Sequence, residues 1–295
     1  MIDFIRLKYQ DRDKMEMFLT SSDNFEHCYQ RIERHTGEIL YPYKVYLHKM
    51  ELCVNPESVF GKNSLHKMAN YIEHKEDHNY NDFSYKRLCN TIDYLNRKVI
   101  DSCSAKITQL EFGLNILTPV PAKKIIANNV LFHKYGLHNV DSNFNGKGKY
   151  KQFEYSNFYI KIYDKAKQYN LDANILRFEI KYKSSKSFRP FGVNTLSDLK
   201  NKTVLSNLFN DLIKRFDELT IIDEIPADVS EKDKKELTSY LSFNHWEKLS
   251  ERKNRNIKKV QIKKFIHLLE KNNLLKTKRI LRNRLIAKFK QLLNN

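Results

Sequence analysis

The chain has 295 residues, of which 41% are hydrophobic, so it can bury a sizeable core as one large domain or two ordinary ones. Its 53 Lys and Arg residues against 35 Asp and Glu residues give a net charge of +18, which favours nucleic acid or an anionic membrane surface as a partner. The sequence predicts no membrane span and no signal peptide, and it lacks the glycine-rich phosphate loops of motor proteins and dehydrogenases.

The first hundred residues predict one strand and two helices. Residues 41–56 alternate apolar and polar side chains and predict a single strand that an Asn-Pro pair closes. Residues 64–73 and 84–99 place apolar side chains three or four apart, which is typical of helices. No role is predicted for residues 1–44, which have a short apolar start and then a polar segment.

Residues 106–121 predict a further strand, which two prolines end. Its apolar row consists of Leu110, Phe112, Leu114 and Ile116. The opposite row carries Glu111 in the middle of the strand, where an unpaired carboxylate gains nothing structurally. The polar, glycine-containing run of residues 143–151 predicts a loop or hairpin turn that could admit DNA.

Residues 158–182 predict a hairpin of two half-buried strands, because both halves alternate with period two. The polar rows are Tyr159, Lys161, Tyr163 and Lys165 in the first half and Arg177, Glu179 and Lys181 in the second. If the two strands pair, a tyrosine, a carboxylate and several cations share one solvent-facing surface. Such a surface suits the binding of a phosphodiester.

The last third of the chain predicts helices. Residues 195–216 carry a helical apolar stripe, and the polar, proline-containing residues 220–236 predict a domain boundary. The remaining residues, 237–295, predict a basic helical region, because sixteen Lys and Arg residues face three acids from His245 onward. Its amphipathic segments could form a solvated helix face or dock in a duplex groove as a helix-turn-helix reader does.

Three of these segments resemble the motifs of rolling-circle replication initiators of small plasmids and single-stranded DNA phages. In the order of that family the motifs are TRLDhAhD, RIYxK and RhEhxh, where h is an apolar residue. Here they are TQLEFGLN at residues 108–115, KIYDK at residues 161–165 and RFEIK at residues 177–181. The resemblance covers roughly residues 45–185.

The resemblance implies that Tyr163 is the nucleophile and that Glu111 and Glu179 bind a divalent metal ion, Mg²⁺ or Mn²⁺. Two departures from the family motif weaken the implied metal site. Glu111 stands where the motif has Asp, and Asn115 stands where the motif has the second acid of that strand. The side-chain oxygen of Asn115 can still serve as a neutral ligand. A tyrosine oxygen can attack phosphorus and remain as a 5′-phosphotyrosine ester, so the implied chemistry agrees with these residue types.

Two roles are open for each of the neighbouring polar residues. Lys161, Lys165, Arg177 and Lys181 could contact phosphates or form a solvated sheet face, and Glu179 could simply pair with Lys161 across the strands. Tyr159 is a rival nucleophile on the same face, but it lacks the motif around it and is expected to stack on a base.

The sequence thus predicts an α+β protein with a central, mostly antiparallel sheet, flanking helices and a basic helical C-terminal region. We expect a nicking domain over residues 1–219, a linker over 220–236 and a DNA-binding region over 237–295. Its partners would be a single-stranded nick site and an origin duplex, with a host helicase, a polymerase and a second copy of the chain as further candidates. The alternatives are a non-catalytic nucleic-acid-binding protein and a related relaxase or transposase-type nicking enzyme. Four scattered cysteines predict reduced thiols in a cytoplasmic protein with no membrane partner.

Overall fold

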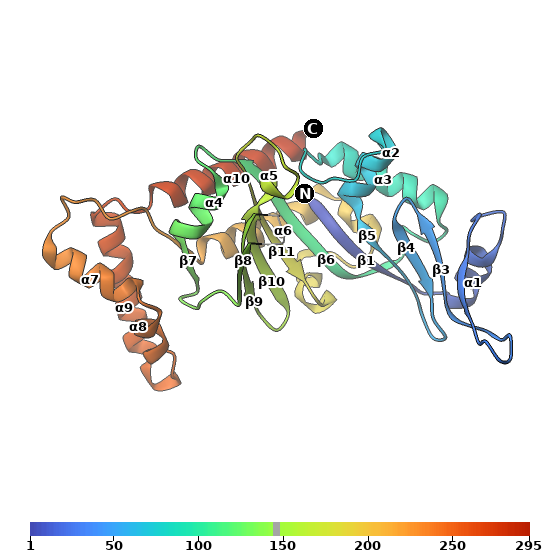
Figure 1. Cartoon of the computed structure of the whole chain (residues 1–295), viewed down its shortest axis with the longest axis horizontal. Helices are drawn as coiled ribbons and strands as arrows, with labels where there is room; N and C mark the ends of the chain where they lie inside the picture. The colour runs from blue at the N-terminus through green and yellow to red at the C-terminus, as the bar shows by residue number, and fades with distance from the viewer. Residues whose placement is uncertain (144–147) are drawn as a thin grey trace.

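The computed structural model describes residues 1–143 and 148–295 (Figure 1). Its largest element is a ten-stranded sheet with the strand order β2-β3-β4-β5-β1-β6-β11-β10-β9-β8, in which neighbouring strands are antiparallel. These strands are β1 (Ile2–Tyr9), β2 (Tyr29–Ile32), β3 (Ile39–Leu47), β4 (Met50–Val54), β5 (Val59–Ser64), β6 (Lys106–Leu117), β8 (Val140–Asn143), β9 (Lys149–Glu154), β10 (Phe158–Asp164) and β11 (Ile175–Tyr182). A second, two-stranded sheet pairs β7 (Val130–His133) with β12 (Leu219–Ile221).

The helices are α1 (Arg12–Thr20), α2 (Leu65–His74), α3 (Tyr85–Lys98), α4 (Ala122–Lys124), α5 (Lys165–Gln168), α6 (Lys202–Asp217), α7 (Glu231–Leu241), α8 (Phe243–Lys248), α9 (Arg255–Lys271) and α10 (Lys276–Asn294). Short 3-10 or π turns are η1 (Ile125–Asn129), η2 (Ser185–Ser187), η3 (Arg189–Phe191), η4 (Leu196–Lys200) and η5 (Arg252–Asn254). The predicted α+β class with a mostly antiparallel sheet is therefore confirmed. Among the described residues, no helix combines the length and the apolar character that crossing a membrane requires.

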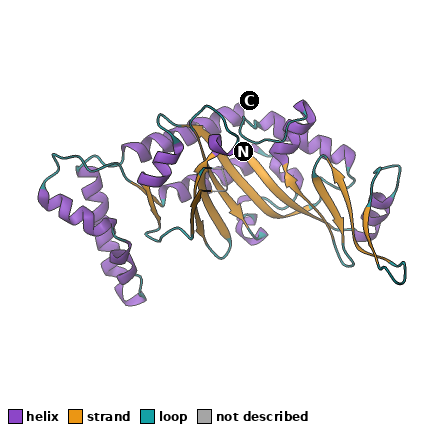
Figure 2. Cartoon of the chain, in the orientation of Figure 1, coloured by secondary structure: helices purple, strands orange, loops and turns teal. Residues whose placement is uncertain are grey.

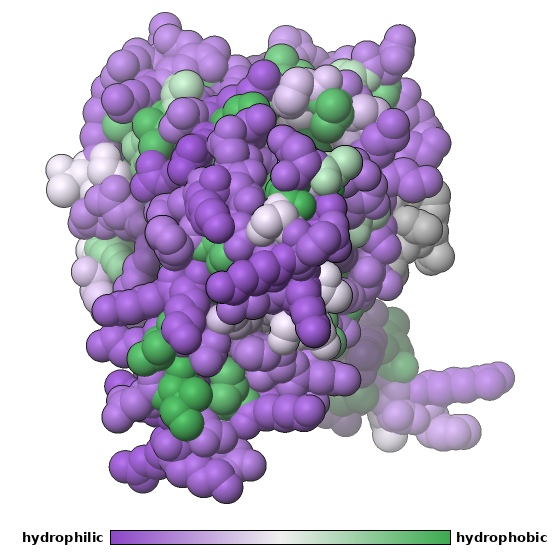
Figure 3. Space-filling view, turned by 90° about the vertical axis from the view of Figure 1, so that its left-hand side faces the viewer, coloured by the Kyte–Doolittle hydropathy of each residue, from purple (hydrophilic) through white to green (hydrophobic). Residues whose placement is uncertain are grey.

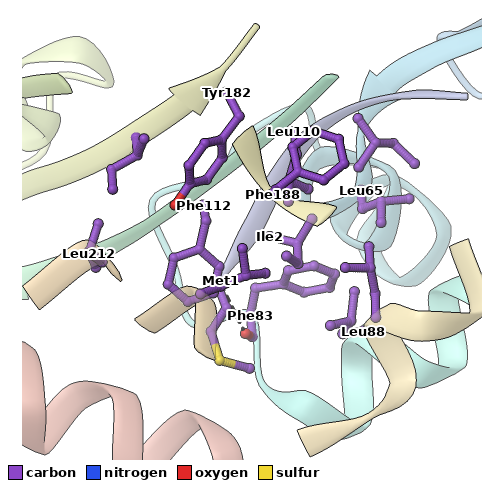
Figure 4. Close-up of a cluster of buried hydrophobic side chains, with 14 of the residues drawn as sticks. Met1, Ile2, Leu65, Phe83, Leu88, Leu110, Phe112, Tyr182, Phe188 and Leu212 are labelled. Carbon is purple, nitrogen blue, oxygen red and sulfur yellow. Dashed lines mark hydrogen bonds between the residues drawn. The ribbon is translucent and has the colours of Figure 1, made fainter. Parts of the chain in front are cut away.

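The helices lie mainly on one face of the large sheet (Figure 2). The apolar row of β6 packs there in one continuous core with side chains of α2, α3, α6 and α10. Figure 4 shows part of this core, where Phe112 of β6 lies near Met1, Ile2 and Tyr182. The opposite face of the sheet carries the polar rows of β6, β10 and β11, and we call it the open face.

The predicted hairpin and the two predicted N-terminal helices are confirmed. β10 and β11 pair with Tyr163 opposite Arg177, and β11 pairs in turn with β6. Helix α2 begins after Ser64, whose side chain accepts a hydrogen bond from the third backbone N–H of the helix, and Ser84 caps α3 in the same way.

The prediction of one strand over residues 41–56 is wrong. The chain reverses at His48 and Lys49, so β3 and β4 form a hairpin. Both turn residues have positive φ values, 44° and 67°, as a tight two-residue hairpin turn requires. The period-two alternation continues through the turn, and neither residue is the Asn or Gly that usually marks one.

Two other segments differ in part from their predictions. Residues 195–216 form η4 and then α6, because Asn201 is extended and caps α6 with its own side chain. In the predicted loop of residues 143–151, residues 144–147 lie outside the described residues, and the residues on either side belong to the β8 and β9 pair.

The C-terminal helices belong to two packing units. Helices α7, α8 and α9 share a separate apolar cluster that contains Leu237, Trp246 and Phe265. Helix α10 instead packs on β6 and on α6 of the main core, and Phe289 of α10 stacks on Phe209 of α6 with ring centroids 4.0 Å apart. The boundary at residues 220–236 stays a prediction, but this packing joins α10 to the main core.

Candidate active site

Three neighbouring strands bring the predicted site residues together on the open face. Across the β6 and β11 pair, Glu111 lies opposite Lys181, Gly113 opposite Glu179 and Asn115 opposite Arg177. Across β11 and β10, Glu179 faces Lys161 and Arg177 faces Tyr163. The site is thus a property of the sheet register, because each strand supplies only part of it.

A cluster of three buried carboxylates forms the centre of this site. Asp3 of β1, Glu111 and Glu179 each offer an oxygen atom, and these atoms lie within 4.8 Å of one another. The two predicted acids therefore converge. Asp3 was not predicted, and the signal that could have found it is a lone acid inside the apolar start Met1-Ile2-Asp3-Phe4-Ile5. We call these three residues the carboxylate cluster.

Gly113 leaves the room that the carboxylate cluster needs. A Cβ atom at this position would lie 2.4 Å from Cβ of Glu179 and 2.8 Å from the carbonyl oxygen of Phe178. The latter is a backbone atom that cannot move aside cheaply. The strand of Glu179 can therefore approach β6 only because residue 113 has no side chain.

Arg177 is buried beside the cluster and bridges Asp3 and Glu179. Its guanidinium donates to Glu179, to Oδ2 of Asp3 at 3.0 Å and to Oδ1 of Asn115 at 3.0 Å. The side-chain amide of Asn115 donates to the carbonyl oxygens of Asn79 and Tyr80. In this arrangement Asn115 orients Arg177, and its predicted role as a metal ligand stays a prediction.

Two lysines form ion pairs with carboxylates of the cluster and neutralise part of their charge. Nζ of Lys161 lies 3.2 Å from Oε1 of Glu111 and 3.2 Å from Oε1 of Glu179, and Nζ of Lys181 lies 3.0 Å from Oε1 of Glu111. The cross-strand pair of Lys161 with Glu179, expected as an alternative, is confirmed. Whether Lys161 and Lys181 also contact phosphate stays a prediction.

The predicted solvent exposure of Lys165, Arg177 and Glu179 is wrong, since all three are buried. Asp164 caps α5 and turns the chain, so Lys165 leaves the row of β10 and points into the fold. Its Nζ donates to Oδ1 of Asn79 at 2.6 Å and to Oε1 of Gln168 at 2.9 Å. Asn79 thus links Lys165 at the start of α5 to Asp3 of the carboxylate cluster.

Tyr163 is half-buried beside these groups. Nζ of Lys165 lies 5.4 Å from the centroid of its ring, and the ring of Tyr150 lies 5.9 Å away. Tyr159 lies further along the same strand, where Nζ of Lys183 is 4.5 Å from its ring centroid. Of the two tyrosines predicted as rivals, Tyr163 is the one opposite Arg177.

Burial and charge set the protonation states of the site. Burial and the Glu179 carboxylate raise the pKa of Tyr163 well above its usual value, so the phenol is protonated at neutral pH. Burial, assisted by the Arg177 charge, lowers the pKa of Lys165 to about 7. Burial alone would raise the pKa of Glu179 and of Asp3, but nearby cations, Arg177 among them, hold both below their usual range. Asp3 and Glu179 are therefore ionised at neutral pH.

The carboxylate cluster fits a hard divalent cation. Mg²⁺ and Mn²⁺ prefer carboxylate oxygens, and the three strands offer them within a small space. Ser64 and Asn79 donate hydrogen bonds to the two oxygens of Asp3, which fixes the orientation of that carboxylate. Nζ of Lys161 contacts Oε1 of Glu111 and Oε1 of Glu179, so its ammonium group and a bound ion would both neutralise these carboxylates.

Comparisons with known proteins give a structural neighbour. No protein-family model matches the sequence, and no curated protein matches it either. A solved structure, that of the rolling circle replication initiator protein from Geobacillus stearothermophilus, is similar over 80% of this chain and 89% of its own, with a TM-score of 0.42 and 10% sequence identity.

Proposed function

We propose that this chain initiates rolling-circle DNA replication by nicking one strand at an origin through Tyr163 and later rejoining it. The observation that carries the proposal is the convergence of Asp3, Glu111 and Glu179 on the face to which Tyr163 belongs. A buried carboxylate cluster that is paired with Arg177, Lys161 and Lys181 is costly for stability alone, which favours a functional role.

The proposed chemistry transfers a phosphodiester to the tyrosine. The hydroxyl oxygen of Tyr163 bonds to phosphorus and loses its proton, and the bond from phosphorus to the 3′ oxygen breaks. That oxygen takes up a proton in exchange, so a 5′-phosphotyrosine ester and a free 3′-hydroxyl result. Attack by that hydroxyl on the ester reverses the reaction and rejoins the strand. Because the ester conserves the bond energy, rejoining needs no nucleotide cofactor.

The residues around Tyr163 divide the remaining tasks. Lys165 is partly neutral near pH 7 and lies next to the Tyr163 ring, so it is our candidate to accept the phenol proton. Lys161, which is partly exposed, supplies positive charge beside the reacting phosphate, and the buried Arg177 orients Glu179 and Asp3. A divalent ion such as Mg²⁺ or Mn²⁺, held by the carboxylate cluster, would add positive charge to stabilise the charge that develops on the phosphate.

The first prediction tests the nucleophile. The protein is incubated with a labelled random-sequence library of single-stranded DNA and MnCl₂, and covalent adducts are separated on a denaturing gel. We expect Tyr163→Phe to lose the adduct and keep DNA binding, because it removes only the attacking oxygen. Tyr159→Phe is the matched control and should keep the adduct. An adduct of undiminished yield with Tyr163→Phe would disprove the assignment.

A second candidate function is non-catalytic binding of nucleic acid on the same scaffold. It is favoured by one observation, that Lys161 and Arg177 already pair with the carboxylates and neutralise them. A pure binder would give no adduct and no dependence on divalent ions. A relaxase or transposase-type nicking enzyme would give the adduct as well, and the sequences of the captured DNA would separate it from a replication initiator.

A further inference from the structure

The open face of the sheet continues beyond the carboxylate cluster and carries residues that the nicking chemistry does not use. The sheet order places β1 next to β6 and β5 next to β1. At the usual spacing of strands, β5 lies roughly 10 Å from the strand of Glu111. A polymer bound at the cluster can therefore extend over β1 and β5.

Aromatic rings and cations are paired along this extension. The guanidinium carbon of Arg6 lies 4.4 Å from the ring centroid of Phe60, and Nζ of Lys181 lies 4.8 Å from that of Phe4. On β10, the ring of Tyr159 is paired in the same manner with Nζ of Lys183. These rings are half-buried, so part of each remains accessible.

A hollow of about 310 Å³ lies in this region. Its walls include Arg6, Lys8, Phe60, Gln109 and Lys183, which come from β1, β5, β6 and the end of β11. Cationic, polar and aromatic side chains therefore line the hollow together. We call Phe4, Arg6, Lys8, Phe60 and Lys183 the shelf.

The cations of the shelf differ from those of the cluster in their partners. Lys161 and Lys181 pair with Glu111. Over residues 1–143 and 148–295, by contrast, Arg6, Lys8 and Lys183 form no ion pair with a carboxylate of the chain. Their charge is therefore available to an external anion.

We propose that the shelf binds single-stranded DNA adjoining the nick site, with phosphates at Arg6, Lys8 and Lys183 and bases stacked on the Phe60 side. The proposal rests on the proposed function, because it names the path of the strand whose phosphodiester reaches Tyr163. A single strand fits better than a duplex, since bases can stack on protein rings only when they are free of their own base stack. The combination of aromatic planes and a cationic groove is the chemistry by which proteins hold single strands without reading their sequence.

The test measures binding of a fluorescent oligodeoxythymidylate by anisotropy in EDTA, so that no ion-dependent step contributes. We expect Phe60→Leu to weaken binding about 5- to 100-fold through the missing stacking surface, and Arg6→Gln to weaken it and reduce its salt dependence. Both variants should unfold at the temperature of the wild type within a few degrees, because both side chains are partly exposed.

The matched controls are Tyr71→Leu and Lys75→Gln in and after α2, where Nζ of Lys75 lies 5.4 Å from the ring centroid of Tyr71 on the helix side of the sheet. They should bind the oligonucleotide like the wild type. Equal affinity of Phe60→Leu, Arg6→Gln and the wild type would overturn the proposal, and so would an equal loss in the controls or no binding by the wild type. If the shelf variants lose affinity but the wild type forms no adduct, the shelf stands and the nicking function fails.

Discussion

At the scale of single residues, the site depends on a missing side chain at Gly113. We expect Gly113→Ala to destabilise the fold by about 1–3 kcal/mol or more, because the new methyl group overlaps the backbone beside Glu179. Thermal unfolding followed by circular dichroism measures the effect. Gly136→Ala is the control, since its Cβ would meet its nearest neighbour at 3.4 Å. Equal melting temperatures for the two variants would contradict this account of Gly113.

Lys161 is the residue that tests whether the carboxylate cluster binds metal. The substitution Lys161→Met removes the ammonium group that pairs with Glu111 and Glu179. Their negative charges then lack this partner, which should cost about 3 kcal/mol of stability. Binding of Mn²⁺ to the folded state restores stability by mass action, so MnCl₂ should raise the melting temperature of Lys161→Met more than that of the wild type.

The control for this metal test is Lys62→Met, which breaks a more exposed pair with Glu51 and should cost less than about 1 kcal/mol. Its response to MnCl₂ should equal that of the wild type. If Mn²⁺ shifts Lys161→Met no further than Lys62→Met, the cluster does not bind the ion as we propose. The readout is stability, so it is independent of any nicking activity.

Lys165 predicts a pH dependence of stability with a definite sign. Its pKa is lowered by burial to about 7 from a usual value of 10.5, so the unfolded chain binds more protons between these pH values and stability rises with pH. From pH 7 to pH 9 the gain should be roughly 2 kcal/mol. Lys165→Met should lack this gain, whereas Lys167→Met in the same helix should follow the wild type in denaturant unfolding at each pH. If the free energies of unfolding of Lys165→Met and the wild type changed in parallel with pH, this role of Lys165 would be refuted.

Most of the residues that converge here were predictable, and the exceptions have physical reasons. Tyr163, Glu111 and Glu179 belong to alternating strands with recognisable motifs, so their shared face follows from the period of two. Asp3 comes from a strand that lies beside β6 only in the folded sheet, and nothing local reveals that pairing. The burial of Lys165 follows from a helix cap at Asp164 that ends the alternation one residue earlier.

At the scale of elements, long and strongly periodic segments were predictable and reversals within them were not. The strand β6 and the helices α2 and α3 agree with their predictions because each has one apolar face and clear end signals. The β3 and β4 hairpin was missed because its turn residues adopt positive φ without being glycine. The packing of helix α10 on the main core could not be predicted, because its partners, such as Phe209, are known only from the tertiary structure.

The placement of α10 predicts different consequences for two similar core substitutions. Leu285 of α10 belongs to the main core, whereas Leu237 of α7 belongs to the separate cluster, and both are fully buried. Each Leu→Ala change should cost about 2–5 kcal/mol locally. In hydrogen exchange followed by mass spectrometry, Leu285→Ala should speed exchange in β6, and Leu237→Ala should speed it in α7 to α9 while sparing β6. Faster exchange of β6 in Leu237→Ala would show that the two clusters unfold as one.

At the scale of the whole molecule, two of the surfaces that carry positive charge lie apart from each other. One is the open face with its site, and the other is the end formed by α7, α8 and α9, which projects away from the sheet (Figure 1). Figure 3 faces that end and shows a mainly hydrophilic surface interrupted by hydrophobic side chains. Helix α9 exposes Arg255, Lys259, Lys263 and Lys264, and also the apolar Ile257 and Val260.

This separation predicts that duplex and single-stranded DNA use different surfaces. Replacing Lys259, Lys263 and Lys264 by Gln should weaken duplex binding and lower the slope of log K against log salt concentration by up to about 3, at roughly 0.9 for each phosphate that is no longer neutralised. The same triple variant should bind the oligodeoxythymidylate like the wild type, because the shelf is intact. Lys86, Lys98 and Lys202, which are exposed on α3 and α6, provide a charge-matched triple control. An unchanged salt slope for the α9 variant, or an equal loss in the control, would show that the duplex is not held at this end and that the excess charge acts without a defined binding surface.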